Sequence, residues 1–475
     1  MKQRILIIGN GVAGITAAFT VRERDSRAEI TVISGESDFF FSRTALMYAF
    51  MDKLDRRDLE PYERKVYGRQ NIQLVRAWVQ DLDAERHMVK LDDGRELTYD
   101  RLLLATGAGP NRFPVPLPGL AEVRQGLVNF VSLGDLDACE ALTPSTRQAV
   151  VVGGGLIGIE LVECLVHHGV KVTFLVREPW FFPLALGREE GTMLTDAMRR
   201  HHIDVRLSDE LASVERDGDG RVSGVVTKAG ERILCQMLGL CIGVRPNKDW
   251  LEKVTTPPKL GRGIIVDPQL RTSLPDVWSA GDCAEIHYPD HSPLPRWVRN
   301  PLIEQIWYSA KRQGALAGHN MSMKGKPAAG LTYTPPIYFN SAKFLDIEYT
   351  TVGETLFAPE GSRVLYRRHP RRAISQTIVS HESRVLGFNM LGSRWDHAVL
   401  TRWVEEGRDI DWVREHLREA QYDVEFGRLD LGALQEEERA YTPLPADVQA
   451  MLGIRKPTNS AAPTSAAADP PGGRP

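Results

Sequence analysis

Two stretches of the chain carry the same order of apolar and polar positions. Residues 4–34 read RILIIGNGVAGITAAFTVRERDSRAEITVIS, and residues 148–176 read QAVVVGGGLIGIELVECLVHHGVKVTFLV. Each stretch begins with a short apolar run, passes through a glycine-rich turn, continues for the length of a helix and ends in a second β-branched run. The pattern therefore predicts strand, turn, helix and strand in both places.

Both turns have the spacing Gly-x-Gly-x-x-Gly. The first glycine allows a tight turn, the second lets a pyrophosphate approach the backbone, and the third lets the helix pack on the strand. The N-terminus of the following helix offers free N–H groups and a positive dipole end to phosphates. Two such turns in matching contexts predict two bound dinucleotides. Their glycines are Gly9, Gly11 and Gly14 in the first turn and Gly153, Gly155 and Gly158 in the second.

Three further segments predict strand ends that pass close to a cofactor. YDRLLLATGAGP and LCIGVRPN each run from an apolar strand into small residues, and LPDVWSAGDCAEI predicts a strand, a turn and then a helix. The residues after these strands are Ala105, Thr106 and Gly107 in the first segment, Gly243 in the second, and Gly281 and Asp282 in the third. The Asp282 carboxylate can accept a hydrogen bond from a sugar-like hydroxyl, or it can cap the helix.

From about residue 331 the pattern changes to short strands joined by hairpin turns, RVLYRR, AISQTIV and RVLGFNML. Two helices are predicted to follow, with Gly407 ending the first and Asp409 capping the second. The final stretch, PTNSAAPTSAAADPPGGRP, contains no apolar residue larger than alanine, and we expect it to be disordered.

Composition narrows the class of protein. The chain has 475 residues and a formal net charge of −3, a balance that argues against nucleic acid as a partner. Its five cysteines are few and widely spread, which favours a reducing compartment and argues against a disulfide framework or a metal site. No signal peptide and no run of about 18 apolar residues is found, so we expect a cytoplasmic protein without a transmembrane helix.

These motifs and their order resemble the FAD-dependent pyridine nucleotide-disulfide oxidoreductase superfamily over nearly the whole folded length. The matching elements are the two glycine turns, ATG, GVRPN and AGDCAE. The resemblance implies an α/β fold with two Rossmann-like dinucleotide-binding domains, one for FAD and one for NAD(P), and a C-terminal α+β interface domain. The implied boundaries are 1–116 and 246–330 for the FAD domain, 117–245 for the NAD(P) domain, 331–442 for the interface domain and 443–475 for a disordered tail.

The stretch FFFSRTALMY places Arg43 where many members of this superfamily carry a reactive cysteine. It is similar instead to the thiol-free branch of rubredoxin reductases, ferredoxin reductases and apoptosis-inducing factor. In that branch the arginine meets the flavin, and a fixed cation there favours negative charge on the cofactor; the alternative is a surface-pairing arginine. Tyr48 stands where the branch often has a lysine. Trp307, at the start of IWYSAKRQGALAGHNM, either stacks over the nicotinamide site or is a core residue.

The resemblance implies a set of binding residues for each dinucleotide. Glu36, just after the second strand, would hold the adenosine ribose of FAD, although Ser34 occupies the strand-end position where many relatives have the acid. The implied FAD-binding residues are Gly9, Gly11, Gly14, Glu36, Arg43, Ala105, Thr106, Gly107, Gly281 and Asp282. The implied NAD(P)-binding residues are Gly153, Gly155, Gly158, Glu160, Arg177 and Gly243. No acid–base residue is identified, and Arg43, Trp307 and Glu160 are the candidates for residues close to the flavin.

The sequence leaves the choice between NADPH and NADH open. Arg177 would pair with the 2′-phosphate of NADPH, whereas Gly158 is more usual in enzymes that use NADH. The expected activity is electron transfer from NAD(P)H through FAD to an acceptor without a redox-active cysteine. The acceptor favoured is a small ferredoxin- or rubredoxin-like carrier. A type II NADH:quinone-like reductase and a redox-sensing or assembly flavoprotein with little turnover are the alternatives.

The C-terminal domain could form a homodimer or a complex with a partner. Its segment YRRHPRR, residues 366–372, places four arginines around a predicted hairpin turn. This segment is either a docking patch for an acidic electron carrier or a solvated turn.

Overall fold

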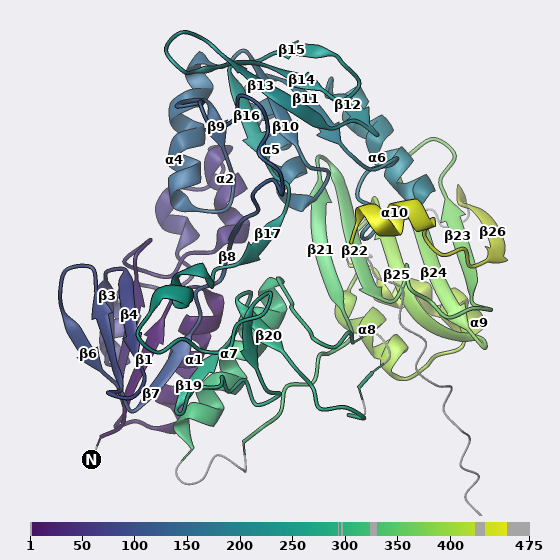
Figure 1. Cartoon of the computed structure of the whole chain (residues 1–475). Coiled ribbons are helices and arrows are strands. Elements are labelled where there is room, and N and C mark those ends of the chain that lie inside the picture. The colour runs from purple at the N-terminus through teal and green to yellow at the C-terminus, as the bar shows by residue number, and fades with distance from the viewer. Residues whose placement is uncertain (1, 293, 296–297, 324–329, 423–432, 454–475) are drawn as a thin grey trace, which may run out of the picture.

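The computed structural model of the protein describes residues 2–292, 294–295, 298–323, 330–422 and 433–453. The chain forms three lobes, each built on its own main sheet (Figure 1). The first two main sheets are parallel and the third is antiparallel. This arrangement confirms the predicted fold class, two Rossmann-like units with a C-terminal α+β part.

The first main sheet has the strand order β19-β7-β1-β2-β3, and all neighbouring strands are parallel. Its β1 strand is buried from its second residue onward, as expected for a parallel sheet covered on both faces. Helices α1 and α7 cover one face, and a three-stranded sheet covers the other. The elements are β1 (Arg4–Ile8), α1 (Val12–Arg24), β2 (Glu29–Ser34), β3 (Ile72–Arg76), β4 (Val79–Asp83), β5 (Met88–Leu91), β6 (Glu96–Thr98), β7 (Arg101–Leu104), β19 (Val277–Ser279) and α7 (Trp307–Ser322).

The second main sheet has the order β12-β11-β10-β16-β9 and is also parallel. Alternate residues of β10 face two different cores: Ala149 and Val151 face the helices, whereas Val150 and Val152 face a small antiparallel sheet. The elements are β9 (Leu127–Val128), α4 (Leu133–Leu142), β10 (Gln148–Val152), α5 (Leu156–His167), β11 (Lys171–Val176), α6 (Arg188–Arg200), β12 (Asp204–Leu207), β13 (Leu211–Arg216), β14 (Val222–Thr227), β15 (Arg232–Leu234) and β16 (Met237–Leu240).

Two antiparallel strands carry the chain between these lobes, β8 (Ala108–Pro110) on the way out and β17 (Val244–Pro246) on the way back. The first sheet is thus completed by β19, which follows the whole second lobe in sequence. The second lobe is therefore an insertion into the first, as the resemblance implied.

The third main sheet is antiparallel, with the order β21-β22-β25-β24-β23-β26. Its hairpins confirm the strands predicted after residue 331, and the helices break at Gly407 as expected. Asp409 accepts hydrogen bonds from the first N–H groups of α9, which confirms its capping role. The elements are β21 (Phe339–Phe344), β22 (Ile347–Gly353), β23 (Arg363–Arg368), β24 (Ser375–His381), β25 (Arg384–Leu391), α8 (His397–Glu405), α9 (Ile410–His416), β26 (Gln435–Ala440) and α10 (Ala446–Met451). The predicted disordered stretch 457–475 lies outside the described residues.

One local prediction was wrong. A strand, β20 (Ala284–Ile286), follows Gly281 and Asp282 where we expected a helix. It pairs in parallel with β18 (Ile264–Val266). Because β18 lies outside the segment LPDVWSAGDCAEI, the pattern of that segment alone could not predict the pairing. The next helix is α7, which begins at Trp307.

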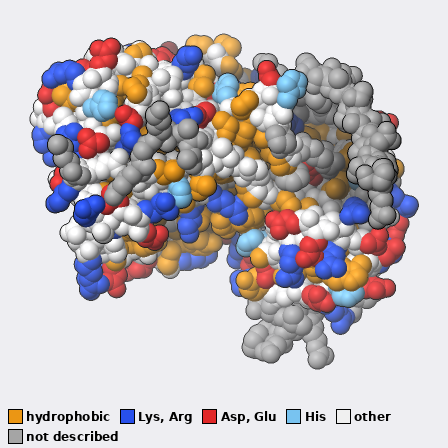
Figure 2. All heavy atoms as spheres, turned by 90° about the horizontal axis from the view of Figure 1, so that it is seen from below, with side chains coloured by type: hydrophobic (Ala, Val, Ile, Leu, Met, Phe, Trp, Pro, Cys, Tyr) orange, Lys and Arg blue, Asp and Glu red, His pale blue; other side chains and the backbone are white. Residues whose placement is uncertain are grey.

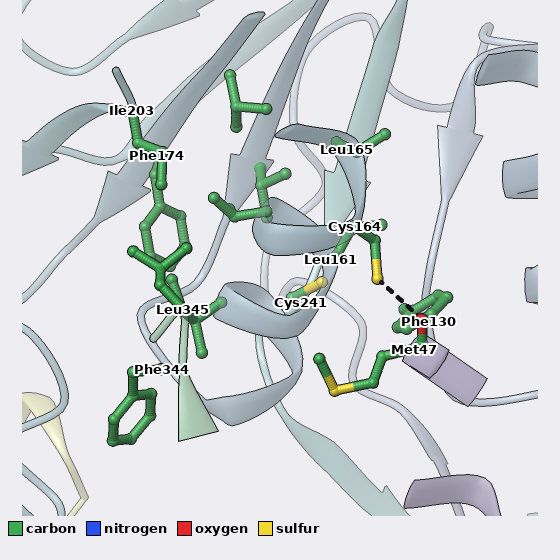
Figure 3. Close-up of a cluster of buried hydrophobic side chains, with 14 of the residues drawn as sticks. Met47, Phe130, Leu161, Cys164, Leu165, Phe174, Ile203, Cys241, Phe344 and Leu345 are labelled. Atoms are coloured by element: carbon green, nitrogen blue, oxygen red, sulfur yellow. Dashed lines mark hydrogen bonds between the residues drawn. The ribbon is translucent and has the colours of Figure 1, made fainter. Parts of the chain in front are cut away.

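The third lobe packs directly on the second. The hairpin between β21 and β22 places Phe344 and Leu345 in the same buried cluster as Phe174 and Ile203 of the second lobe (Figure 3). The Glu190 side chain, only 2% exposed, accepts hydrogen bonds from Thr377 at 2.6 Å and from Asn389 at 3.3 Å. On the face seen in Figure 2, side chains of both charge signs are interspersed and a hollow separates two lobes.

Candidate functional site

The first glycine turn is shaped by contacts that exclude side chains at two of its three glycines. Gly9 has a φ of +108°, and a Cβ atom there would lie 2.1 Å from the carbonyl oxygen of Ala105. A Cβ at Gly14 would lie 2.0 Å from the carbonyl oxygen of Gly9. A Cβ at Gly11 would meet no protein atom within 4 Å. The middle glycine therefore faces open space.

The second glycine turn repeats this geometry. Gly153 has a φ of +116°, and a Cβ there would lie 2.2 Å from the carbonyl oxygen of Cys241. A Cβ at Gly158 would lie 2.0 Å from the carbonyl oxygen of Gly153, and Gly155 again faces open space. The two turns are the same local structure built twice.

Both turns lead into a helix with a free N-terminus. Gly11 and Gly155 are the N-cap residues of α1 and α5, so neither helix has a side chain that caps its first N–H groups. Neither helix carries an acidic residue in its first turn. Open space beside uncapped N–H groups and a positive dipole end suits a pyrophosphate. The residues present thus fit two dinucleotides, with one at each turn.

The segment after β7 is tied to the segment after β17. The Thr106 hydroxyl donates to the carbonyl oxygen of Asn247 at 2.8 Å, and the Asn247 side chain donates to the carbonyl oxygen of Thr106 at 3.1 Å. Gly107 and Gly243 both have positive φ, of +68° and +92°, where the chain turns away from each sheet. Ala105, at the end of β7, forms the wall against which Gly9 packs. The ATG and GVRPN motifs therefore lie together at the crossing between the lobes.

Gly281 and Asp282 lie at the end of β19, close to α7. Burial raises the pKa of Asp282 to about 6, and the positive charge of Arg43 partly opposes this rise. The Gly281 N–H donates to the side-chain oxygen of Gln313 at 2.8 Å. The Gln313 amide nitrogen in turn donates to Glu304 at 3.2 Å, and the Tyr333 hydroxyl donates to the same carboxylate at 2.6 Å. Asp282 thus has Arg43 nearby, and its turn is held by α7.

Sequence reasoning missed the positioning role of Glu304 and Tyr333. The available signal in the sequence was Gln313, a polar residue on the buried face of α7. It is 1% exposed and lies between Ala310 and Ala317, so it needs hydrogen-bond partners.

Arg43 lies next to Phe41 and Glu36. Its guanidinium is 5.0 Å from the centre of the Phe41 ring, donates to the Val131 carbonyl oxygen at 2.7 Å, and forms an ion pair with Glu36. The Glu36 carboxylate also accepts the N–H of Leu133 at 3.1 Å. A ribose at Glu36 would therefore share that carboxylate with Arg43. About half of the Arg43 side chain is exposed, which leaves donors available to a ligand.

The cysteines lie away from this chemistry. All five are free and buried, and burial raises the pKa of each thiol, to about 12 for Cys139 and Cys235. Cys164 donates to the carbonyl oxygen of Met47 at 3.6 Å inside the core (Figure 3). A thiol held in the protonated form in this way is a poor nucleophile. Cys235 and Cys241 are both core residues, 0% and 6% exposed.

Glu160, on α5, carries the second strongly perturbed carboxyl group. Burial and, to a smaller extent, the negative charge of Glu163 raise its pKa to about 7. Burial also raises the pKa of Tyr48, and the negative charges of Glu163 and Glu160 add to this rise. No hydrogen bond or ion pair of the Glu160 carboxylate occurs within the described part of the chain.

Trp307 is the first residue of α7 and is partly buried. Its indole N–H is shielded from solvent and has no hydrogen-bond partner among the described residues. The Lys311 ammonium lies 5.4 Å from its ring centre, and Tyr308 packs edge-on against it. The indole thus has an aromatic face and a donor that the described residues leave without a partner.

Arg177 is the first residue after β11, and its guanidinium is already engaged. It donates to Glu178 at 2.9 Å and to the carbonyl oxygen of Met451 at 2.5 Å.

No group of three or more His, Cys, Asp and Glu side chains suited to a metal ion occurs among the described residues. No helix in that part of the chain is long and apolar enough to span a membrane.

Known proteins share this arrangement. The sequence model of the family "Pyridine nucleotide-disulphide oxidoreductase" matches residues 3–314. The chain is 26% identical over 411 residues to "Nitrite reductase [NAD(P)H]" of Bacillus subtilis (strain 168), a match that covers 86% of this chain but only 48% of that relative. It is 31% identical over 283 residues to the "5,5'-dehydrodivanillate O-demethylase ferredoxin reductase subunit" of Sphingobium sp. (strain NBRC 103272 / SYK-6), which covers 59% of this chain and 67% of that one.

The fold also matches solved structures. A chain in the crystal structure of the covalent putidaredoxin reductase–putidaredoxin complex superposes with a TM-score of 0.75 at 21% identity. The match covers 88% of this chain and 99% of that chain. At this identity the superposition establishes the fold alone.

Proposed function

This chain belongs to the pyridine nucleotide-disulphide oxidoreductase family, and we propose that it passes electrons from NAD(P)H through FAD to a small electron-carrier protein. FAD and NAD(P)H are its cofactors, and its class is that of an FAD-dependent NAD(P)H oxidoreductase. The observation that carries the proposal is the pair of open glycine turns combined with Arg43 in place of a thiol.

Each glycine turn would bind one of the two dinucleotides. The first turn, with Gly11 at the start of α1, would hold the FAD pyrophosphate, and Arg43 would add a cation beside it. Asp282 would accept a hydrogen bond from a hydroxyl of the ribityl chain, and Glu36 one from the adenosine ribose. The proposed FAD-binding set is the one that the resemblance implied, with Gly9, Gly14, Ala105, Thr106, Gly107 and Gly281 shaping the backbone around it.

The second turn would hold the pyridine nucleotide. Gly155 and the N-terminus of α5 would bind its pyrophosphate, and Gly153, Gly158 and Gly243 would shape the surrounding backbone. Glu160, one turn into the same helix, would border the nicotinamide. The proposed domain boundaries remain 1–116 and 246–330 for FAD, 117–245 for NAD(P), 331–442 for the interface domain and 443–475 for the tail. Residues 446–451 of this tail are not disordered as expected, because they form α10.

When bound, the flavin ring supplies the redox chemistry, since it accepts a hydride from the nucleotide and releases electrons to the next carrier. The protein residues contribute positions and charges. Trp307 would offer an aromatic surface beside the reacting rings, and its free indole N–H would find an acceptor there. The side chain at position 43 is an arginine, so no thiol at this position takes part in the transfer.

The proposed acceptor is a ferredoxin- or rubredoxin-like carrier. One relative is described as a ferredoxin reductase subunit, and the matching fold includes a chain solved with putidaredoxin. Free buried thiols favour the cytoplasm as the compartment. The C-terminal sheet is the proposed surface for a partner or for a second copy of the chain.

Stopped-flow spectroscopy tests this function. The purified protein should be yellow, its flavin should bleach on mixing with NADH or NADPH, and a carrier added afterwards should restore the colour of oxidised flavin. A protein that binds FAD but is bleached by neither nucleotide would contradict the proposed reaction. Fast reoxidation by quinones but not by any carrier would contradict the proposed acceptor.

A further inference from the structure

The C-terminal helix α10 packs on the second lobe. Val448 is 1% exposed and Leu444 8%, and both lie in one small buried cluster with Trp180, which is 2% exposed. The Trp180 indole N–H donates to the carbonyl oxygen of Leu186 at 3.0 Å, which fixes the surface that receives the helix. In Figure 1, α10 lies between the third sheet and α6.

Arg177 joins this helix to the end of β11. Its guanidinium donates to the carbonyl oxygen of Met451, the last residue of α10, at 2.5 Å. The same nitrogen donates to Glu178 at 2.9 Å. A cation at the C-terminus of a helix satisfies a free carbonyl group and interacts favourably with the helix dipole. Arg177 therefore serves α10 in the structure.

The end of β11 also borders the second glycine turn. A Cβ atom at Gly154 would lie 2.6 Å from the Val176 side chain, so the turn and the strand end are in contact. In dinucleotide-binding folds this strand end reaches the adenosine ribose, and the side chains that follow it distinguish a 2′-hydroxyl from a 2′-phosphate.

The first lobe shows which residue is equivalent to Glu178. The Gly9 N–H donates to the carbonyl oxygen of Ile33, and the Gly153 N–H donates to that of Leu175. Aligning these hydrogen bonds places Glu178 at the position of Glu36. The equivalent carboxylates are thus both paired with an arginine, and each arginine also donates to a backbone carbonyl elsewhere, Arg43 to Val131 and Arg177 to Met451.

We propose that α10 sets the nucleotide preference of the protein by holding Arg177. This inference rests on the proposed binding of a pyridine nucleotide at the second glycine turn. With α10 docked, the Met451 carbonyl and Glu178 hold two of the three guanidinium nitrogens, so a 2′-phosphate meets an arginine that is already paired with a carboxylate. The docked protein therefore favours NADH, and undocking the helix releases Arg177 for the 2′-phosphate of NADPH.

The test uses the full-length holoprotein and two ligands that cannot reduce the flavin, ADP-ribose and 2′-phospho-ADP-ribose. Val448→Asp places a charge in the buried contact with Trp180 and should undock α10, which hydrogen exchange at residues 446–451 verifies. Leu444→Asp is a second variant with the same purpose. Ala446→Asp adds the same charge on the exposed side of the helix and is the matched control.

Calorimetry should show that the undocked variants bind 2′-phospho-ADP-ribose roughly tenfold more tightly than wild type, as expected for a charge-assisted hydrogen bond gained. Affinity for ADP-ribose should stay within about twofold. The Ala446→Asp control should match wild type. Combining Val448→Asp with Arg177→Ala should abolish the tenfold gain, because the helix acts through Arg177.

Several outcomes would overturn the inference. If α10 undocks and the ratio of the two affinities is unchanged, or the gain persists without Arg177, the helix does not set the preference. Tighter binding of 2′-phospho-ADP-ribose than of ADP-ribose by wild type would also contradict it. Failure of wild type to bind either ligand would instead contradict the proposed function of the second turn, so the two failures are distinguishable.

Discussion

The backbone N–H of Gly281 donates a hydrogen bond to the side-chain oxygen of Gln313 at 2.8 Å, across 32 residues of sequence. Through this bond, α7 holds the turn that carries Asp282. The same helix packs closely on α1, since a Cβ atom at Gly314 would lie 2.2 Å from the carbonyl oxygen of Ala13. Through α7, Gln313 thus connects α1, the helix at the first glycine turn, with Asp282, the carboxylate proposed to bind the ribityl chain.

Replacing Gln313 by leucine should weaken both stability and FAD retention. The Gly281 N–H would lose its acceptor in a buried site, at a cost of about 1–3 kcal/mol in the free energy of unfolding. Chemical unfolding and the fraction of flavin retained after gel filtration measure the two effects. Gln305→Leu, an exposed change shortly before the same helix, is the control. Equal behaviour of the two variants would show that the hydrogen bond does not position the turn.

Substitutions of Gly11 and of Gly155 should have different effects on the two bound dinucleotides. Gly11→Leu should fold, because nothing lies within 4 Å of the added Cβ, but should yield a colourless protein whose pyrophosphate site is filled. Gly155→Leu should remain yellow and lose reduction by both nucleotides. Absorbance spectra and stopped-flow reduction check these outcomes. A yellow Gly11→Leu protein, or a Gly155→Leu protein reduced at the wild-type rate, would place the dinucleotides elsewhere.

Cysteine should be dispensable for flavin reduction. All five thiols are buried, so each Cys→Ala change should cost some stability without changing the rate at which the nucleotide reduces the flavin. Rapid-mixing measurements on the five single variants provide the test. Loss of reduction in any well-folded variant would show that a thiol takes part after all.

Glu160 should make the stability of the FAD-free protein depend on pH. Its pKa is raised from 4.5 to about 7, so the folded protein holds a proton that the unfolded chain has released between these values. Stability contributed by this group is therefore lost as pH rises from about 4.5 to 7. Glu160→Gln should gain about 3 kcal/mol over wild type above pH 8, relative to the difference at pH 4.

Denaturant unfolding across this pH range measures the Glu160 effect. The exposed Glu405→Gln serves as control and should show no such trend. A constant difference between Glu160→Gln and wild type at all pH values would mean that the pKa of Glu160 is the same in the folded and unfolded protein.

The hairpin of residues 366–372 should affect the rate at which a carrier associates. Arg368, Arg371 and Arg372 are exposed, whereas Arg367 is largely buried and pairs with Glu436 at 2.5 Å. The Arg371 and Arg372 amides donate to the His369 ring, which folds the turn. Replacing the three exposed arginines by glutamine should slow reduction of an acidic carrier at low salt, because steering acts over about 10 Å.

Reduction of the flavin by NAD(P)H should be unchanged in this triple variant, and the ionic-strength dependence of carrier reduction should weaken. Replacing three exposed arginines of the first lobe, Arg27, Arg69 and Arg86, by glutamine controls for net charge. If the triple variant reduces the carrier as fast as wild type at low salt, the hairpin is a solvated turn.

The sequence by itself determined the two Gly-x-Gly-x-x-Gly turns. It also determined that position 43 carries an arginine and not a cysteine. These features are local, because a glycine with positive φ and the strand–turn–helix pattern around it are encoded within about 30 residues. The hairpins of the third sheet and the break between α8 and α9 are local in the same sense. Cys235 and Cys241 could be judged core residues from the apolar run in which they lie.

Tertiary structure alone decided how these parts meet. Arg177 was a candidate ligand for a 2′-phosphate in the sequence, yet its guanidinium contacts Met451, 274 residues later. Glu36 was expected at a ribose, but the fold pairs it with Arg43 and the N–H of Leu133. Pairing with β18 turned residues 284–286 into a strand. A side chain with several donors or acceptors can take many partners, and only packing between distant segments selects among them.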